Sequence, residues 1–185
     1  DLESLRAAPL ASGQTVEETR RALIAKIGEN IIVRRVQRVT GGAHIGTYVH
    51  GRRIGVAVAL DGGDDELARD VAMHVAASNP RYIDEGGVPA DELAKEKEIL
   101  SEQARNEGKP EQIVEKMVVG RLRKFLAGIT LVGQPFVTDP DVTVGKLLSS
   151  RDASVRDFVR FEVGEGIEKK QENFVEEVMA QVRGA

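Results

Sequence analysis

The chain has 185 residues, 41% of them hydrophobic and 30% charged, which is enough for one full core or two small ones. The absence of cysteine excludes disulfides and thiolate chemistry and suits a cytoplasmic protein. A net charge of −4 disfavours direct nucleic-acid binding, and no apolar run approaches the roughly 20 residues that would predict membrane insertion.

The N-terminal residues predict one helix. Thr15 and Glu18 form a capping box, and an apolar face continues until Gly28, which predicts a helix over 15–27. Because the chain begins with Asp1 rather than Met, we expect it to be part of a longer protein.

Three antiparallel strands are predicted next, over residues 31–39, 44–50 and 54–60, with glycine-containing turns between them. A helix over 66–78 then ends before Pro80. The acidic run after Gly62 and Gly63 favours helix capping over phosphate binding, because its carboxylates would repel an anion.

Residues 90–125 carry the most informative pattern, two charged amphipathic helices joined by a turn at 108–110. Gly108 suits the left-handed residue that ends a helix, and Pro110 suits the start of the next. A projecting helical hairpin usually works by contacting another protein. The alternative is a hairpin packed wholly into its own globule.

After the hairpin we predict a loop over 130–138 interrupted at Asp139 and Pro140, a helix over 142–149, a strand over 155–163 and a helix over 174–182. The predicted class is α+β, with two related small modules of antiparallel sheet and packed helices, an inserted antiparallel coiled-coil hairpin and a C-terminal helix. The corresponding domains are residues 1–85, 90–127 and 128–185.

The sequence offers little for catalysis. His44, His50 and His74 have no spacing that would place two imidazoles on one metal ion, so core or surface roles are favoured. The glycines at 164 and 166 lack the third glycine of a dinucleotide site and predict a tight turn. We expect no enzyme activity, catalytic residue, metal site or cofactor.

Five phrases in order resemble the bacterial translation elongation factor Ts family, from about residue 20 to the end of the chain. They are residues 25–30 (AKIGEN), 50–55 (HGRRIG), 72–80 (AMHVAASNP), 133–137 (GQPFV) and 161–169 (FEVGEGIEK).

The resemblance implies a guanine nucleotide exchange factor that binds elongation factor Tu, the GTPase that carries aminoacyl-tRNA, and speeds GDP release without covalent chemistry. It implies no direct contact with nucleic acid or membrane, and it is compatible with a homodimer or with a heterotetramer with elongation factor Tu. The family's N-terminal helical domain and Thr-Asp-Phe segment are expected to precede Asp1. Asp157-Phe158 is not the equivalent of the Asp-Phe pair in that segment, because it falls in the last predicted strand.

Matched residue by residue, the resemblance implies that Ile27 and Gly28 face the partner's nucleotide domain and that His50, Arg69 and Val137 belong to the contact set of the core. Each has a structural alternative, such as a core position for Ile27, a helix stop for Gly28 or a strand end for His50. Relatives can carry lysine at the position of Arg69, and Val137 could belong to a small core. Gln181 stands where relatives can have methionine, so an apolar contact there is in doubt.

Two other classes of function stay open. The hairpin could serve as a structural or oligomerisation module without exchange activity, which self-association in the absence of a GTPase would favour. An enzyme would need a ligand that stabilises the chain alone.

Overall fold

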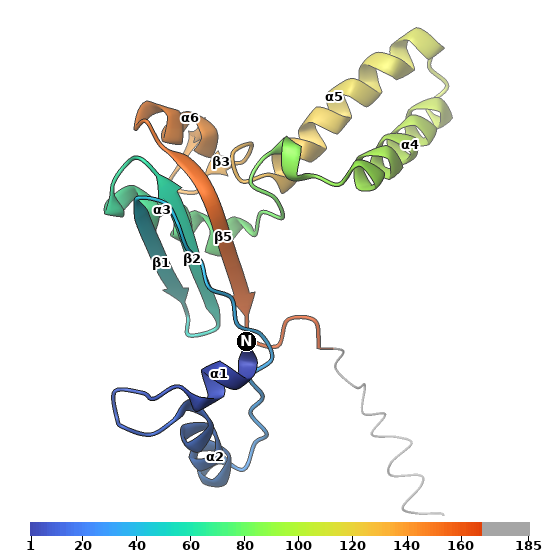
Figure 1. The fold of residues 1–185 in the computed structure, drawn as a ribbon. Helices are drawn as coiled ribbons and strands as arrows, with labels where there is room; N and C mark the ends of the chain where they lie inside the picture. Colours follow the sequence, from blue (N-terminus) through green and yellow to red (C-terminus); the bar gives the residue numbers. More distant parts are fainter. Residues whose placement is uncertain (168–185) are drawn as a thin grey trace, which may run out of the picture.

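The computed structural model describes residues 1–167, so the predicted helix over 174–182 and Gln181 lie outside the described residues. The described helices are α1 (Leu2–Ala7), α2 (Val16–Ile27), α3 (Asp65–Ser78), α4 (Ala90–Asn106), α5 (Glu111–Ile129) and α6 (Val144–Ser150), with a short 3₁₀ turn at Glu85–Gly87. The described strands are β1 (His44–His50), β2 (Ile54–Asp61), β3 (Pro135–Phe136), β4 (Asp139–Thr143) and β5 (Ser154–Glu162) (Figure 1). These helices and small antiparallel sheets confirm the α+β class.

The main sheet has the order β1-β2-β5, and both pairs of neighbours are antiparallel. β1 and β2 form a hairpin from His44↔Leu60 to His50↔Ile54, as predicted. β5 comes from the far side of the helical hairpin and pairs with β2 in the register Val58↔Phe158. One sheet therefore draws its strands from both sides of the hairpin, and the division into three domains stays a prediction.

The strand predicted over 31–39 is wrong. Residues 29–41 contain no helix or strand, and the third strand of the sheet is β5 instead. Ile32 and Val36 have side chains suited to a strand, yet both are exposed. Strand propensity reflects packing against neighbouring strands, and no strand in residues 1–167 pairs with this segment.

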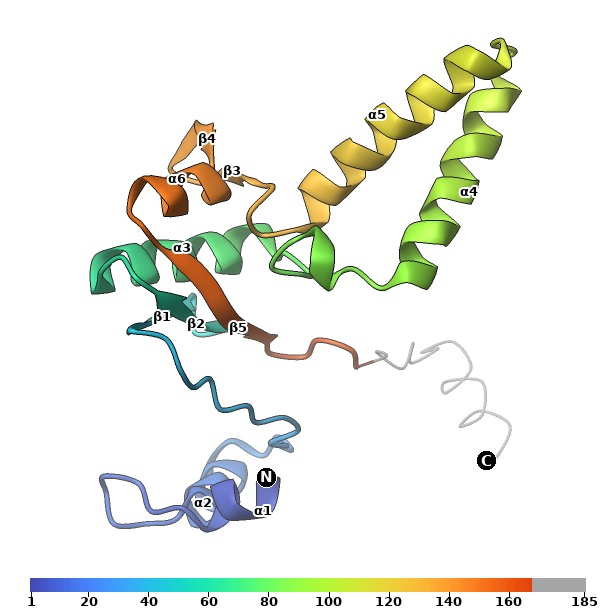
Figure 2. The ribbon, with the colours of Figure 1, turned by 45° about the horizontal axis from the view of Figure 1, so that its top comes forward.

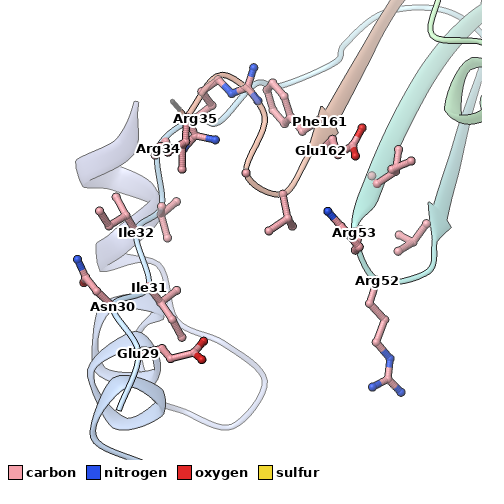
Figure 3. A pocket seen from close by; sticks show the side chains of 17 residues that line it. Glu29, Asn30, Ile31, Ile32, Arg34, Arg35, Arg52, Arg53, Phe161 and Glu162 are labelled. Atoms are coloured by element: carbon pink, nitrogen blue, oxygen red, sulfur yellow. The ribbon is translucent and has the colours of Figure 1, made fainter. Parts of the chain in front are cut away.

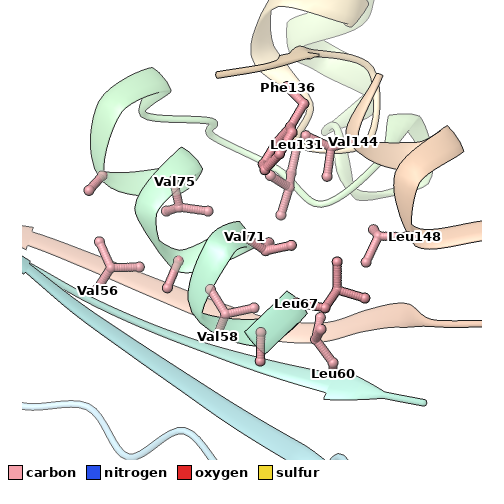
Figure 4. Close-up of a cluster of buried hydrophobic side chains, with 13 residues drawn as sticks. Val56, Val58, Leu60, Leu67, Val71, Val75, Leu131, Phe136, Val144 and Leu148 are labelled. Atoms are coloured by element: carbon pink, nitrogen blue, oxygen red, sulfur yellow. The ribbon is translucent and has the colours of Figure 1, made fainter. Parts of the chain in front are cut away.

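The core lies between the sheet and α3, which crosses one face of it (Figure 2). Val58 and Leu60 of β2 meet Val71 and Val75 of α3, and residues from beyond the hairpin close the far side (Figure 4). A side chain cannot be added at Gly46, since its Cβ would lie 2.1 Å from the carbonyl oxygen of Ala68. α3 therefore rests directly on β1.

The predicted hairpin is present as α4 and α5, which pack antiparallel to each other and extend away from the sheet (Figures 1 and 2). Their own buried cluster consists of Leu100, Ala104, Val114 and Val118, separate from the main core. Residues 106–110 at the tip are exposed, and Gly108 has the left-handed φ of 70° that the sequence predicts.

The root of the hairpin is joined to the core through backbone pairing. Tyr82 and Thr130 form an isolated parallel bridge, with the Leu131 N–H donating to the Tyr82 carbonyl at 2.8 Å. The two ends of the hairpin are thereby fixed side by side.

The loop predicted around 130–138 contains a feature that the sequence did not predict. β3 and β4 form a small ladder through Pro135↔Thr143 and Phe136↔Asp139, with a register shift between the two pairs. Val137 and Thr138 are left as the turn. β3 has only two residues, which is too few to show the apolar-polar alternation of a strand. Pro135 also has no N–H to donate to a ladder, so its presence argued against a strand.

Candidate functional site: a protein-docking surface

The five predicted contact residues lie at three places, and all five are exposed. Ile27 and Gly28 end α2, Arg69 and His50 lie on neighbouring parts of α3 and β1, and Val137 occupies the β3–β4 turn. Exposure removes the core alternative for Ile27, whose side chain is 53% accessible. Their role as contact residues stays a prediction.

The first place is an elbow at the end of α2. Gly28 adopts φ 74° and caps the helix, so it is a helix stop whether or not it touches a partner. Arg20 fixes the chain that follows by donating to the carboxylate of Glu17 at 2.8 Å and to the carbonyl of Ile31 at 2.8 Å. Arg20 first, and then Arg21, lower the pKa of Glu17 to about 2. Ile27 is therefore presented on an elbow held by charge-assisted hydrogen bonds.

Beside this elbow is a cleft of about 730 Å³ between residues 29–35 and one end of the sheet (Figure 3). The guanidinium of Arg35 lies 4.6 Å from the ring centroid of Phe161 and pairs with Glu165 at 2.7 Å. That hydrogen bond from Arg35 lowers the pKa of Glu165. Apolar walls edged by guanidinium groups suit another polypeptide better than a small metabolite.

The second place is a groove of about 470 Å³ between β1 and α3, here called the β1–α3 groove. Its lining residues are Ile45, Gly46, Thr47, Tyr48, Val49, Asp65 and Arg69. The absence of a side chain at Gly46 lets α3 approach β1, which places Arg69 beside the strand. Ile45 and Val49 lie on the same face of β1, opposite to that of Gly46, and are 47% and 69% exposed. The groove itself therefore carries the carboxylate of Asp65 and the guanidinium of Arg69, while Ile45 and Val49 expose aliphatic surface on the other face of the same strand.

His50 extends the β1–α3 groove at the end of β1. Its Nδ1 lies 3.3 Å from the Tyr48 hydroxyl, and the two rings stack with centroids 6.1 Å apart. At the other end of β1, His44 pairs with Asp65 at 2.6 Å. The sequence pointed to His50 and Arg69 through the resemblance but missed Ile45 and Val49. Their spacing of four residues, twice the two-residue period of a strand, was a signal that both lie on one face.

The third place is Val137, whose side chain is 42% exposed while its backbone N–H donates to Nδ1 of His74 at 3.2 Å. His74 is fully buried, as its predicted place on the apolar side of a helix suggests. Burial lowers its pKa, and a hydrogen bond to Gln134 partly opposes that shift.

The three histidines are thus engaged at three separate positions. Within residues 1–167 no three His, Asp or Glu side chains are placed to hold a metal ion. None of the described helices is both long and apolar enough to cross a bilayer.

Comparison with known proteins identifies what the chain is similar to. The sequence model of the family described as Elongation factor TS matches residues 1–165. The chain is 63% identical over its whole length to Elongation factor Ts of Methylococcus capsulatus and 63% identical over 94% of its length to that of Thioalkalivibrio sulfidiphilus. It is 54% identical over 99% of its length to that of Legionella pneumophila strain Paris. The chain spans 60–63% of the length of these relatives.

Proposed function

This chain belongs to the elongation factor Ts family, and from that premise we propose that it binds the GTPase elongation factor Tu and accelerates the release of GDP. The observation that carries the proposal is the β1–α3 groove. Arg69 and His50 lie at the α3 side of the edge strand β1, and the exposed aliphatic side chains of Ile45 and Val49 lie on the other face of the same strand. Aliphatic contact area and a cation around one exposed edge strand match a protein partner that offers apolar side chains and a carboxylate.

The proposed mechanism is differential binding rather than covalent chemistry. A factor that binds the nucleotide-poor state of the GTPase more tightly than the GDP-bound state shifts the partner towards the former. By linkage, GDP weakens the binding of the factor by the same ratio as the factor weakens the binding of GDP. Ile27 and Gly28 would act at the nucleotide domain, while the β1–α3 groove and Val137 supply binding that is common to both states.

The hairpin offers less support for the alternative of an oligomerisation module. Its apolar stripe is already covered, because Leu100 and Ala104 of α4 are buried against Val114 and Val118 of α5. The exposed aliphatic side chains on its surface, Ile99, Ile113 and Val119, are separate from that stripe.

The test is calorimetric titration of the chain into nucleotide-free elongation factor Tu, with and without excess GDP. We expect association that GDP weakens. Arg69→Ala should weaken it by about 5–30-fold, equivalent to about 1–2 kcal/mol. Arg123→Ala is the matched control, because Arg123 is also exposed but lies on the hairpin. No association at about 50 μM, or equal losses for both variants, would contradict the proposal.

A further inference from the structure

A buried polar network lies directly beneath Val137. Its two side chains are His74, which is fully buried, and Gln134, which is 6% exposed. Nε2 of His74 lies 3.0 Å from Oε1 of Gln134, and Nδ1 accepts the N–H of Val137 at 3.2 Å. Since a backbone N–H can only donate, Nδ1 is the acceptor and Nε2 carries the proton. Both ring nitrogens are therefore engaged in one defined orientation.

The amide of Gln134 extends the network to the ends of two helices. It donates to the carbonyl of Gly128, in the last turn of α5, at 2.7 Å and to the carbonyl of Ser78, the last residue of α3, at 3.4 Å. Carbonyls in the last turn of a helix have no partner within that helix. Gln134 thus joins the end of α3, the root of the hairpin and the segment that carries Val137.

The turn itself depends on this support. Val137 and Thr138 lie between the paired residues Phe136 and Asp139, outside the β3–β4 ladder. Phe136 is buried, with its ring 5.8 Å from that of His74, so the segment is anchored on one side of the turn. The hydrogen bond from the Val137 N–H to the imidazole of His74 then fixes the backbone that carries the exposed Val137 side chain.

Resting on the proposed function, we propose that His74 and Gln134 are positioning residues for docking, which hold Val137 in the orientation that elongation factor Tu binds. A buried polar network costs desolvation that an apolar core would avoid, but when every group has a partner it admits one arrangement. The advantage at this place is a single fixed geometry for an exposed valine on a short turn.

Two substitutions of the same residue separate positioning from core stability. The Oδ1 of asparagine can take the place of Nδ1, so His74→Asn keeps an acceptor for the Val137 N–H. The longer amide of His74→Gln reaches the place of Nε2, keeps the contact with Gln134 and loses that acceptor. Both remove the ring, so both should lower the thermal unfolding midpoint similarly.

The experiment measures affinity for nucleotide-free elongation factor Tu by calorimetry, for both variants in the native and the Val137→Ala backgrounds. We expect His74→Gln to weaken binding about fivefold and His74→Asn less than twofold. In the Val137→Ala background, His74→Gln should have no further effect, because its action passes through Val137. Equal losses for the two variants, or the same fivefold loss with Val137 already truncated, would overturn the proposal.

A spectroscopic measurement on the unaltered chain tests the same proposal without depending on whether a variant folds. ¹⁵N NMR of the unaltered chain should show His74 protonated on Nε2 alone and a coupling between Nδ1 and the amide nitrogen of Val137. A proton on Nδ1, or rapid solvent exchange of the Val137 amide, overturns the proposal. If the unaltered chain shows no binding, the proposed function fails as well, whereas binding that is indifferent to these variants refutes only the positioning role.

Discussion

At the scale of single residues, His74 differs from the other two histidines because protein groups occupy both of its ring nitrogens. Phe136, Gln134 and Val137 surround the ring, and no charged side chain forms an ion pair with it within the described residues. Desolvation therefore dominates and lowers the pKa from its ordinary value of 6.5. A protonated ring would turn a donor towards the Val137 N–H and break that hydrogen bond.

This shift predicts how stability depends on pH. As pH falls below 6.5, the unfolded chain takes up a proton at His74 before the folded chain does. The contribution to the free energy of unfolding is thus complete above pH 6.5 and is lost as the pH falls through the lowered pKa. Urea unfolding between about pH 5 and 8 should show this loss in the chain but not in His74→Asn. Parallel curves for the two proteins would contradict it.

At the scale of elements, the attachment of the hairpin is the notable contact. Glu92 of α4 accepts a hydrogen bond from the Tyr82 hydroxyl at 2.6 Å and pairs with Arg81 at 2.6 Å. The hydrogen bond from Tyr82, and then that from Arg81, lower the pKa of Glu92. Tyr82 also bridges Thr130, so one residue contacts both ends of the hairpin. We expect this clamp to set the direction in which the hairpin points.

A prediction follows for Tyr82→Phe combined with Glu92→Gln. Spin labels at Lys109→Cys on the tip and Lys146→Cys on α6 report the angle of the hairpin, and the absence of native cysteine makes the labelling specific. The double substitution should broaden the distance distribution while leaving the thermal midpoint nearly unchanged. Glu98→Gln, on the exposed side of the same helix, is the control. A distribution as narrow as that of the unaltered clamp would exclude this role.

The hairpin should also be separable from the core. Its buried cluster shares no residue with the main one, so replacing residues 91–126 by a short Gly-Ser linker should leave a folded protein. The measurement is thermal unfolding by circular dichroism, where one cooperative transition is expected. Loss of cooperativity would show that the hairpin belongs to the main core.

Elements with local signals could be predicted from the sequence. The capping box at Thr15, the N-cap at Asp64 and the glycine at 108 mark where helices begin or end, and each is confirmed. Features that depend on distant partners could not be predicted. The 31–39 segment looks like a strand but finds no ladder in the described residues, and Gln134 gives no sign of its contact with His74, 60 residues away.

At the scale of the whole molecule, the three candidate contact places lie on the α2 elbow, the β1–α3 groove and the β3–β4 turn. The binding free energy would be distributed over these three separate places, so a substitution at any one of them should weaken binding without abolishing it. Exchange is more demanding, because it requires contacts that are stronger in the nucleotide-poor state than in the GDP-bound state.

The 185 residues contain no Thr-Asp-Phe, the segment that the family resemblance associates with entry into the partner's nucleotide domain. A protein made of these 185 residues alone is therefore predicted to bind elongation factor Tu better than it promotes exchange. Stopped-flow release of a fluorescent GDP is the measurement, with the full-length relative from Methylococcus capsulatus as reference. Matching rate enhancements for the two proteins would refute this separation.

The pairing of β2 with β5 also bears on the order of folding. The two strands cannot meet until residues 62–153 have been closed into a loop, and the entropy of closure grows with the length of free chain. Once α4 packs against α5 and Tyr82 pairs with Thr130, residues 83–129 no longer add to the length of the flexible loop. The flexible chain that remains to be closed is then about half as long. Halving it saves about 0.6 kcal/mol, roughly a threefold gain in rate. Val118→Asp, which unzips the hairpin, should slow refolding by that factor, whereas excising the hairpin should not.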